Sequence, residues 1–170
     1  REKISYVFQD AFLFSNTIDS NIAFANTDVD ESRVRECAKR AMADDFINEL
    51  SDGYQTIVGE KGFGLSGGQK QRVSIARAML KDAPVFVFDD STSALDAETE
   101  RKLLENLRTY YKERTILIAA HKMSSVVDCD EIIYLSNGKI VERGTFDELM
   151  ELDGHFAGVY KTQMAKQTVA

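Results

Sequence analysis

The stretch Val85-Phe-Val-Phe-Asp-Asp90 consists of four consecutive apolar residues that end in two acids. An apolar run without polar alternation is typical of a central strand that is buried on both faces. Residues 115–120 have the same character, and residues 4–8 read as a third strand. Helical patterns separate these strands, which predicts an α/β fold with a largely parallel sheet.

Local signals predict the remaining elements. The spacing of apolar residues predicts helices at about 31–42, 45–50, 67–80, 98–111 and from 146 to the C-terminus. Asp30 is the expected N-cap of the first of these. Residues 59–64 hold three glycines and are expected to form a loop. The Asn137-Gly138 pair predicts a hairpin of strands 132–135 and 139–142.

Composition limits the classes of function. The chain has 170 residues, 44% apolar and 29% charged, which is typical of one globular domain. Its 21 basic and 28 acidic residues give a net charge of −7, so there is no basic field for a nucleic-acid backbone. The longest apolar runs have four or five residues, too few for a spanning helix, and residues 1–5 show no signal-peptide pattern. Cys37 and Cys129 lack metal-site spacing and are expected to be reduced thiols of a cytosolic protein.

The pentapeptide Leu65-Ser-Gly-Gly-Gln69 has two interpretations. Ser66 followed three residues later by Gln69 is the pattern of a capping box, which is purely structural. However, Gly67 and Gly68 fall in the first helical turn, where each costs up to about 1 kcal/mol relative to alanine. A simple cap does not require glycine at these two positions. A helix start that binds a phosphate does, because the phosphate must approach the backbone N–H groups, and these groups and the helix dipole favour an anion.

Polar residues follow the predicted strands at Gln9, Asp89-Asp90 and His121. In parallel sheets, function collects at the carboxyl ends of the strands. A carboxylate there can hold Mg²⁺ beside nucleotide phosphates, and Asp90 can orient or deprotonate an attacking water. The structural alternative is a turn in which Asp90 or Ser91 caps the next element. Without other motifs, this alternative is the favoured one.

Four segments occur in the order and spacing found in ATP-binding cassette (ABC) nucleotide-binding domains, which the chain resembles over nearly its whole length: Gly64-Leu-Ser-Gly-Gly-Gln-Lys-Gln-Arg72, Val85–Asp90, Ser93-Ala-Leu-Asp96 and His121. The resemblance implies a partial P-loop NTPase core with a mostly parallel sheet and an α-helical subdomain. It places the Q-loop and the helical subdomain with the signature at about 10–82. The core with Walker B, D-loop and switch histidine falls at about 83–170.

The resemblance also implies a role for each site residue, with ATP and Mg²⁺ as the bound groups. Gln9 resembles the Q-loop glutamine, which contacts Mg²⁺ or the attacking water, and Asp89 resembles the Walker B aspartate, which holds Mg²⁺. Asp90 takes the catalytic position after it, and His121 resembles the switch histidine, which bonds to the γ-phosphate.

A second set of residues resembles the parts of the family that meet a second nucleotide-binding domain. The signature residues bind the γ-phosphate of ATP held by that second domain; here they are Ser66, Gly67, Gly68 and Gln69. Ser93 and Asp96 resemble the D-loop, which lines the dimer interface.

Three segments resemble the exporter subgroup: residues 8–18 its Q-loop continuation, residues 56–62 its X-loop, and residues 137–144 its closing hairpin. Ile57 stands where an acid is more usual. The implied protein is the ATP-driven motor of an exporter at the cytoplasmic face of the cell membrane. Its partners are the transmembrane domain of the same transporter, whose coupling helix is received near residues 12–14, and no nucleic acid. The alternatives are a soluble ABC ATPase acting on DNA or ribosomes, and a non-catalytic truncated cassette.

Two departures from the family pattern change these expectations. The Walker A string Gly-x-x-x-x-Gly-Lys-[Ser/Thr] does not occur in the chain. The chain is therefore expected to be the C-terminal part of a cassette, inactive alone, with an uncovered sheet edge that promotes self-association. The family has glutamate where this chain has Asp90. Aspartate withdraws the carboxylate by more than about 1 Å, which can cost about 10²-fold in rate. The site is expected to be slow, and the second domain to be a different chain with a catalytic glutamate.

Overall fold

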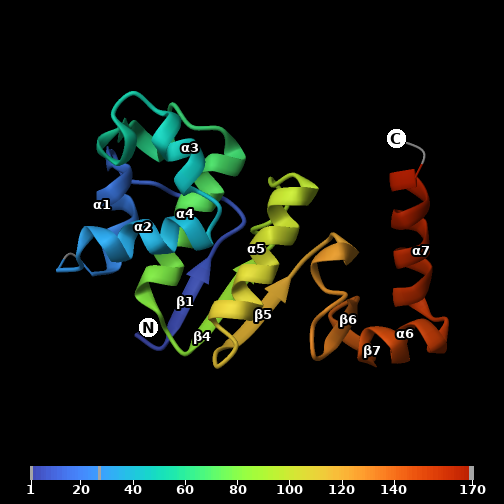
Figure 1. Cartoon of the computed structure of the whole chain (residues 1–170). Coiled ribbons are helices and arrows are strands. Elements are labelled where there is room, and N and C mark those ends of the chain that lie inside the picture. Colours follow the sequence, from blue (N-terminus) through green and yellow to red (C-terminus); the bar gives the residue numbers. More distant parts are fainter. Residues whose placement is uncertain (1, 27, 169–170) are drawn as a thin grey trace. The chain divides into compact units, whose positions relative to one another are not determined.

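The computed structural model describes residues 2–26 and 28–168 (Figure 1). The chain forms two compact units, Arg1–Ala119 and Ala120–Ala170. Among the helices of the described residues, none combines the length and the apolar character that crossing a membrane requires.

A three-stranded parallel sheet is the centre of the first unit. Its strands are β1 (Ile4–Val7), β4 (Val85–Asp89) and β5 (Thr115–Ala119), in the order β1-β4-β5. The register pairs Val7 with Phe88, and Phe88 with Ile118. The three strands therefore end at one edge of the sheet, and the predicted parallel α/β fold is confirmed.

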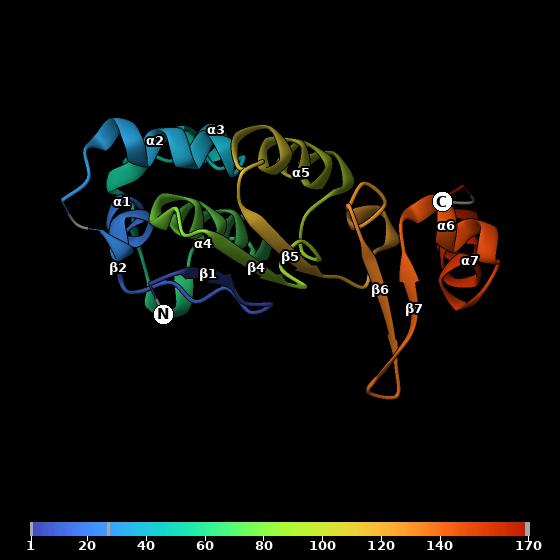
Figure 2. The same ribbon diagram turned by 90° about the horizontal axis from the view of Figure 1, so that it is seen from below.

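The two faces of this sheet differ in burial. Val7, Phe86 and Phe88 are buried in the core beneath the helices α4 (Gly67–Lys81) and α5 (Ala97–Tyr110), and Figure 2 shows both helices on one side of the sheet. On the other face, Tyr6 and Leu117 are 42% and 55% exposed. Within the described residues, the strands at 85–88 and 115–120 are therefore buried on one face, where the apolar runs predicted burial on both. The described helices of this unit cover one face only.

The segment between β1 and α4 is mainly helical. It contains α1 (Ile18–Ile22), α2 (Glu31–Arg40), α3 (Asp44–Glu49) and a short antiparallel pair, β2 (Asn16–Thr17) with β3 (Ile57–Val58). Asp30 caps α2 as predicted, because its side chain accepts the N–H of Arg33 at 3.0 Å. The helix expected through Met42 ends at Arg40, since Met42 has φ +59° and turns the chain into α3.

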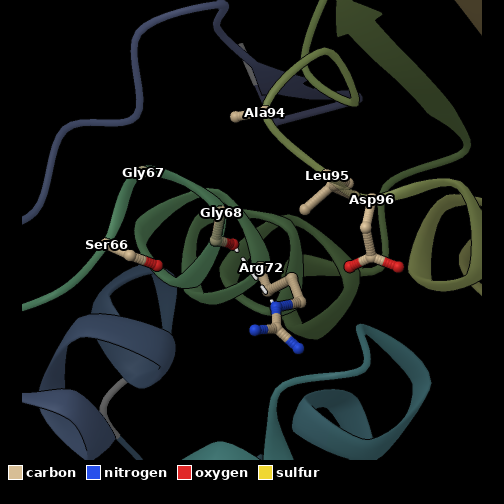
Figure 3. Close-up of a pocket in the computed structure, with 7 residues that line it drawn as sticks. All are labelled: Ser66, Gly67, Gly68, Arg72, Ala94, Leu95 and Asp96. Atoms are coloured by element: carbon tan, nitrogen blue, oxygen red, sulfur yellow. Dashed lines mark hydrogen bonds between the residues drawn. The ribbon is translucent and has the colours of Figure 1, made fainter. Parts of the chain in front are cut away.

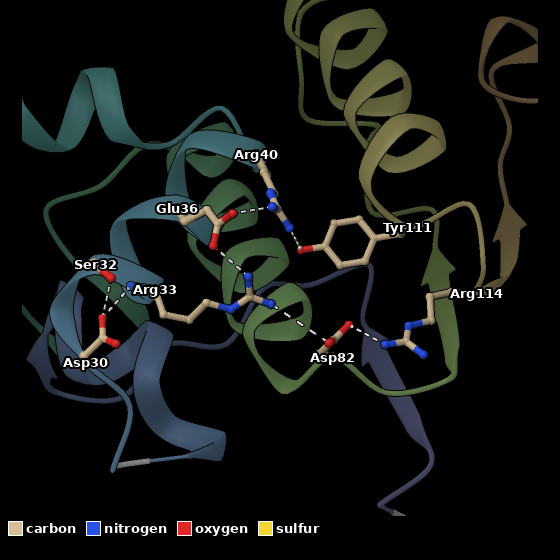
Figure 4. Close-up of polar contacts among 8 residues, drawn as sticks. All are labelled: Asp30, Ser32, Arg33, Glu36, Arg40, Asp82, Tyr111 and Arg114. Carbon is tan, nitrogen blue, oxygen red and sulfur yellow. Dashed lines mark hydrogen bonds and ion pairs between the residues drawn. The ribbon is translucent and has the colours of Figure 1, made fainter.

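Polar contacts connect α2 with the ends of α4 and α5 (Figure 4). Asp82, which follows α4, forms an ion pair with Arg114 at 3.2 Å and a longer one with Arg33 at 3.9 Å. Arg40 pairs with Glu36 and donates to the hydroxyl of Tyr111 at 3.5 Å. Burial raises the pKa of Tyr111 to about 12, so this hydroxyl keeps its proton across the physiological range.

Arg77 on α4 holds the chain that follows β1. Its guanidinium donates to the carbonyl of Asn21 at 2.7 Å, to the side chain of Asn21 at 2.9 Å and to the carbonyl of Phe12 at 2.9 Å. It also lies over the rings of Phe14 and Phe24, at 5.5 and 5.7 Å from their centroids. Burial lowers the pKa of Arg77 to about 10, so it remains charged at neutral pH.

The second unit is a hairpin followed by two helices. The strands β6 (Ile132–Ser136) and β7 (Lys139–Gly144) meet at Asn137-Gly138, where both residues have positive φ, as the predicted turn requires. The helices are α6 (Phe146–Leu152) and α7 (His155–Thr168). A small core joins these elements; it consists of Met123, Ile132, Leu149 and Phe156.

The helix expected from 146 onward is divided in two. Asp153 has φ +50°, and the buried Glu142 carboxylate accepts the N–H groups of His155 and Phe156. A Cβ at Gly154 would collide with a carboxylate oxygen of Glu142. The capping carboxylate therefore occupies the space at the break, and it comes from the neighbouring β7 strand.

Cys37 is buried and Cys129 half-buried, and neither forms a disulfide among the described residues. This agrees with the expectation of reduced thiols.

We predict that Arg77→Lys lowers the free energy of unfolding by about 2 kcal/mol, because an ammonium cannot reproduce the planar fork that reaches three acceptors. Arg101→Lys is the matched control: Arg101 makes an exposed ion pair with Glu105, and its replacement should cost less than about 0.5 kcal/mol. Urea unfolding of the three proteins measures both values. Equal losses would contradict the structural role of Arg77.

Candidate functional site

Four side chains, from the ends of β1 and β4 and from the residues that follow them, meet at the carboxyl edge of the sheet. Gln9 follows β1, and its Nε2 donates to Asp90 Oδ2 at 3.3 Å. Tyr6 lies on β1, and its hydroxyl donates to Asp89 Oδ2 at 2.7 Å. The structure therefore brings Gln9 and Asp90 together, as the strand pattern predicted, and it adds Tyr6. Its bond to Asp89 is also the main reason that the pKa of the Tyr6 hydroxyl is raised.

Asp90 occupies a tight turn after β4. Its φ is +44°, a conformation that aspartate tolerates better than most residues. Its N–H donates to the Ala119 carbonyl at 2.7 Å, and its own carbonyl accepts the Ser93 hydroxyl at 2.8 Å. Neither Asp90 nor Ser91 caps the next element, since the N-cap of α5 is Asp96; the structural alternative is therefore present only as a turn. Since it uses only backbone groups of Asp90, the carboxylate is left to face Gln9.

The start of α4 is a complete capping box. The Ser66 hydroxyl accepts the N–H of Gln69 at 3.3 Å, and the Gln69 side chain accepts the N–H of Ser66 at 2.9 Å. The structural interpretation of this pair is confirmed. The N–H groups of Gly67 and Gly68 also fall in the first helical turn, where the helix itself supplies no acceptor.

The structure gives a reason for glycine at position 68 that the sequence did not reveal. A Cβ at Gly68 would lie 3.0 Å from the carbonyl oxygen of Ala94, whereas one at Gly67 would lie 4.0 Å from the Ala94 side chain. Ala94 is 26 residues away in the sequence, so no local pattern announces this contact. The close approach of two backbones therefore explains one of the two glycines without a ligand.

A pocket of about 440 Å³ lies between the start of α4 and the turn before α5 (Figure 3). It is lined by Ser66, Gly67, Gly68, Arg72, Ala94, Leu95 and Asp96. Asp96 caps α5 by accepting the N–H of Thr99 at 2.9 Å, and this bond is the main cause that lowers the pKa of Asp96.

Arg72 gives one side of this pocket a positive charge. Its guanidinium donates to the Met42 carbonyl at 2.7 Å and to the Gly68 carbonyl at 3.4 Å, and it lies 4.7 Å from the centre of the Phe46 ring. Burial lowers the pKa of Arg72, and Asp96 and Asp45 oppose that effect. A helix start with a fixed guanidinium nearby suits an anionic group.

His121 belongs to the second unit. Gln163 on α7 holds the backbone around it: its Nε2 donates to the His121 carbonyl at 2.8 Å, and its Oε1 accepts the N–H of Met123 at 2.9 Å. Sequence reasoning missed Gln163, because the contact spans 42 residues.

The oxygen atoms at the sheet edge suit Mg²⁺ that arrives with a nucleotide. Asp89, Asp90 and Gln9 offer carboxylate and amide oxygens, which Mg²⁺ prefers. Among the described residues there is no cluster of three or more His, Cys, Asp or Glu that forms a metal site by itself. Mg²⁺ usually binds through one or two carboxylates together with substrate phosphates and water. This edge of the sheet therefore suits a cation that is bound jointly by the protein and a nucleotide better than a cation that is bound by protein side chains alone.

Comparison with known proteins decides the family, since the sequence profile of ABC transporters matches residues 1–93. This chain belongs to the ABC transporter family. An ATP-dependent lipid A-core flippase of Legionella pneumophila (strain Paris) is 48% identical over 163 residues, 96% of this chain. The Escherichia coli (strain K12) flippase is 42% identical over 167 residues, 98% of the chain.

A solved structure of a bacterial Atm1-family ABC exporter with ATP bound has a TM-score of 0.91 and 40% identity to this ABC chain, and it covers 96% of the chain. The predicted partial ABC ATPase core with its helical subdomain is confirmed. The chain spans 28% of the length of that structure, and 28% and 29% of the two flippases.

The two glycines of the capping box yield a matched pair of variants. Gly68→Ala should lower the free energy of unfolding by about 1–3 kcal/mol, because a backbone carbonyl must move away from the new methyl group. Gly67→Ala should leave it unchanged or raise it by up to about 1 kcal/mol through helix propensity. Thermal and urea unfolding of the purified protein measure the difference. If Gly68→Ala is as stable as Gly67→Ala, the backbone contact with Ala94 is not what requires a glycine there.

Proposed function

We propose that this chain is the C-terminal part of one nucleotide-binding domain of an ABC exporter, whose intact form uses ATP to drive transport across a membrane. The observation that carries the proposal is the meeting of Gln9 and Asp90 at the edge of the parallel sheet, 3.3 Å apart. Residues at about 10–82 then form the helical subdomain, and those at about 83–170 belong to the core. The names of the flippase and exporter relatives support transport over an action on DNA or ribosomes.

The sheet edge would serve the nucleotide of its own domain. Asp89 and the Gln9 amide oxygen would hold Mg²⁺, which neutralises phosphate charge when it is bound with ATP. The Asp90 carboxylate would orient the attacking water and accept its proton. The hydrogen bond from Gln9 fixes the direction of that carboxylate before any ligand arrives. His121, in the second unit, would bond to a γ-phosphate.

The pocket at the start of α4 would serve the nucleotide of a second domain. Ser66, Gly67, Gly68 and Gln69 would meet its γ-phosphate, since the first turn of a helix offers N–H donors and the positive end of the dipole. The Arg72 guanidinium adds positive charge behind them. Ser93 and Asp96 would line the interface between the two domains. Each chain would therefore contribute to two ATP sites.

An exposed aromatic cluster would meet the transmembrane domain. Phe14 stacks on Phe24 with ring centroids 4.2 Å apart, and Phe12 meets Phe14 edge-on at 5.1 Å. All three rings are more than one-third exposed, although Leu13 between them is fully buried. Aromatic groups held on a rigid base by Arg77 are suited to receive an apolar helix.

The aspartate at position 90 supports a transporter whose two ATP sites hydrolyse ATP at unequal rates. Its carboxylate is shorter by one methylene than the glutamate of the family pattern, and misplacement of about 1 Å can cost about 10²-fold in rate. The helix start at Ser66–Gln69, in contrast, has every residue of the signature. A slow site beside an intact signature suits a partner domain from a different chain, which carries a catalytic glutamate.

ATP hydrolysis by the full-length transporter pair tests this proposal. Changing the partner's catalytic glutamate to glutamine should nearly abolish turnover, because that residue serves the fast site. Asp90→Asn should reduce turnover much less. The 170-residue chain alone should show no turnover and very weak Mg-ATP binding, since it lacks the Walker A string that contacts the β- and γ-phosphates.

Four results would contradict parts of the proposal. Equal losses from the two changes, or an active homodimer, would exclude unequal sites. Micromolar ATP affinity of the chain alone, measured by calorimetric titration, would exclude the need for further phosphate-binding residues. Absence of ATP hydrolysis in the intact protein would remove the motor function itself.

A further inference from the structure

The hydrogen bond between Tyr6 and Asp89 joins two strands across the sheet. The register pairs Tyr6 with Val87, and Asp89 lies two residues further along β4. Side chains two residues apart on a strand share a face, so Tyr6 and Asp89 both lie on the face away from α4 and α5. The tyrosine therefore reaches diagonally toward the carboxyl end, and its hydroxyl lies 2.7 Å from Asp89 Oδ2.

The ring of Tyr6 has an aromatic neighbour on the same face of the sheet. Tyr6 is 42% exposed in this chain, and the centroid of the Phe8 ring lies 4.4 Å from the centroid of the Tyr6 ring at an interplanar angle of 41°. This contact limits the positions that the Tyr6 ring can adopt. Together with the strand register, it directs the hydroxyl toward Asp89.

A donor on one oxygen of a carboxylate sets the orientation of the other. Tyr6 occupies one lone-pair position on Oδ2, which leaves Oδ1 and the second lone pair of Oδ2 free to bind a cation or to accept from its water. Outer partners of this kind orient metal-binding side chains, and their loss typically costs about 10–100-fold in metal affinity or activity.

We propose that Tyr6 is a positioning residue that orients Asp89 toward the Mg²⁺ of bound ATP. Together with the bond from Gln9 to Asp90, this contact means that β1 and the residue two positions after it bond to the carboxylates of Asp89, which ends β4, and Asp90, which follows it. This inference rests on the proposed function, because it requires a metal-bound nucleotide at the sheet edge. It adds a residue whose role lies outside the motifs of the sequence.

Metal binding tests the proposal separately from turnover. Tyr6→Phe removes only the hydroxyl and keeps the ring against Phe8. Tyr54→Phe is the matched control, because the Tyr54 hydroxyl also donates to an aspartate, Asp44, at 2.5 Å in the helical segment. Mn²⁺ replaces Mg²⁺ as the probe, and electron paramagnetic resonance of the full-length protein with a non-hydrolysable ATP analogue gives the dissociation constant of Mn²⁺.

The expected result for Tyr6→Phe is a rise of about tenfold in that constant, with an unchanged melting temperature and unchanged metal-free affinity for the analogue. Tyr54→Phe should leave the constant unchanged. An unaltered constant in Tyr6→Phe, or an equal rise in both variants, overturns the role of Tyr6. If the wild-type protein shows no nucleotide-dependent binding of Mn²⁺, the proposed function itself is refuted. Failure of the role of Tyr6 and failure of the proposed function therefore give different results.

Discussion

The parallel pairing of β1 with β4 is the constraint on which the rest of the structure depends. Residues more than 80 positions apart in the sequence become neighbours because Val7 is paired with Phe88. That register places Tyr6 beside Asp89 and Gln9 beside Asp90. Since side chains alternate along a strand, a slip of one residue would turn Asp89 and Val87 toward the helices and bring Phe88 to the open face. The apolar side chains of the covered face thus also fix the chemistry at the sheet edge.

The turn after β4 links this edge to the pocket at the start of α4. Its first residue, Asp90, is held by the Ala119 carbonyl and by Ser93, and its last, Asp96, caps α5. Between them, the Ala94 carbonyl approaches Gly68 so closely that a side chain there would collide with it. Seven residues of backbone therefore connect the carboxylates at the sheet edge with the start of α4. This connection is short, and hydrogen bonds at both of its ends keep the two surfaces close together.

The sequence predicted what local patterns determine. The caps at Asp30 and Ser66, the Asn137-Gly138 turn and the strand at 85–88 all depend on residues within a few positions of each other. It failed where distant segments decide the outcome. Apolar residues alone cannot tell whether one or both faces of β4 are covered, and nothing near Gly68 announces Ala94. Likewise, the hydroxyl of Tyr6 can reach Asp89 only because β1 lies beside β4.

A structure of the intact protein with Mg²⁺ and a non-hydrolysable ATP analogue, determined by electron cryomicroscopy, tests the central claim most directly. We expect each nucleotide to be contacted by Asp89 and Gln9 of one domain and by the helix start at Ser66 and Gly68 of the other. The claim that each chain serves two sites would be contradicted if Asp89 and Ser66 of one chain met the same nucleotide, or if the start of α4 met none.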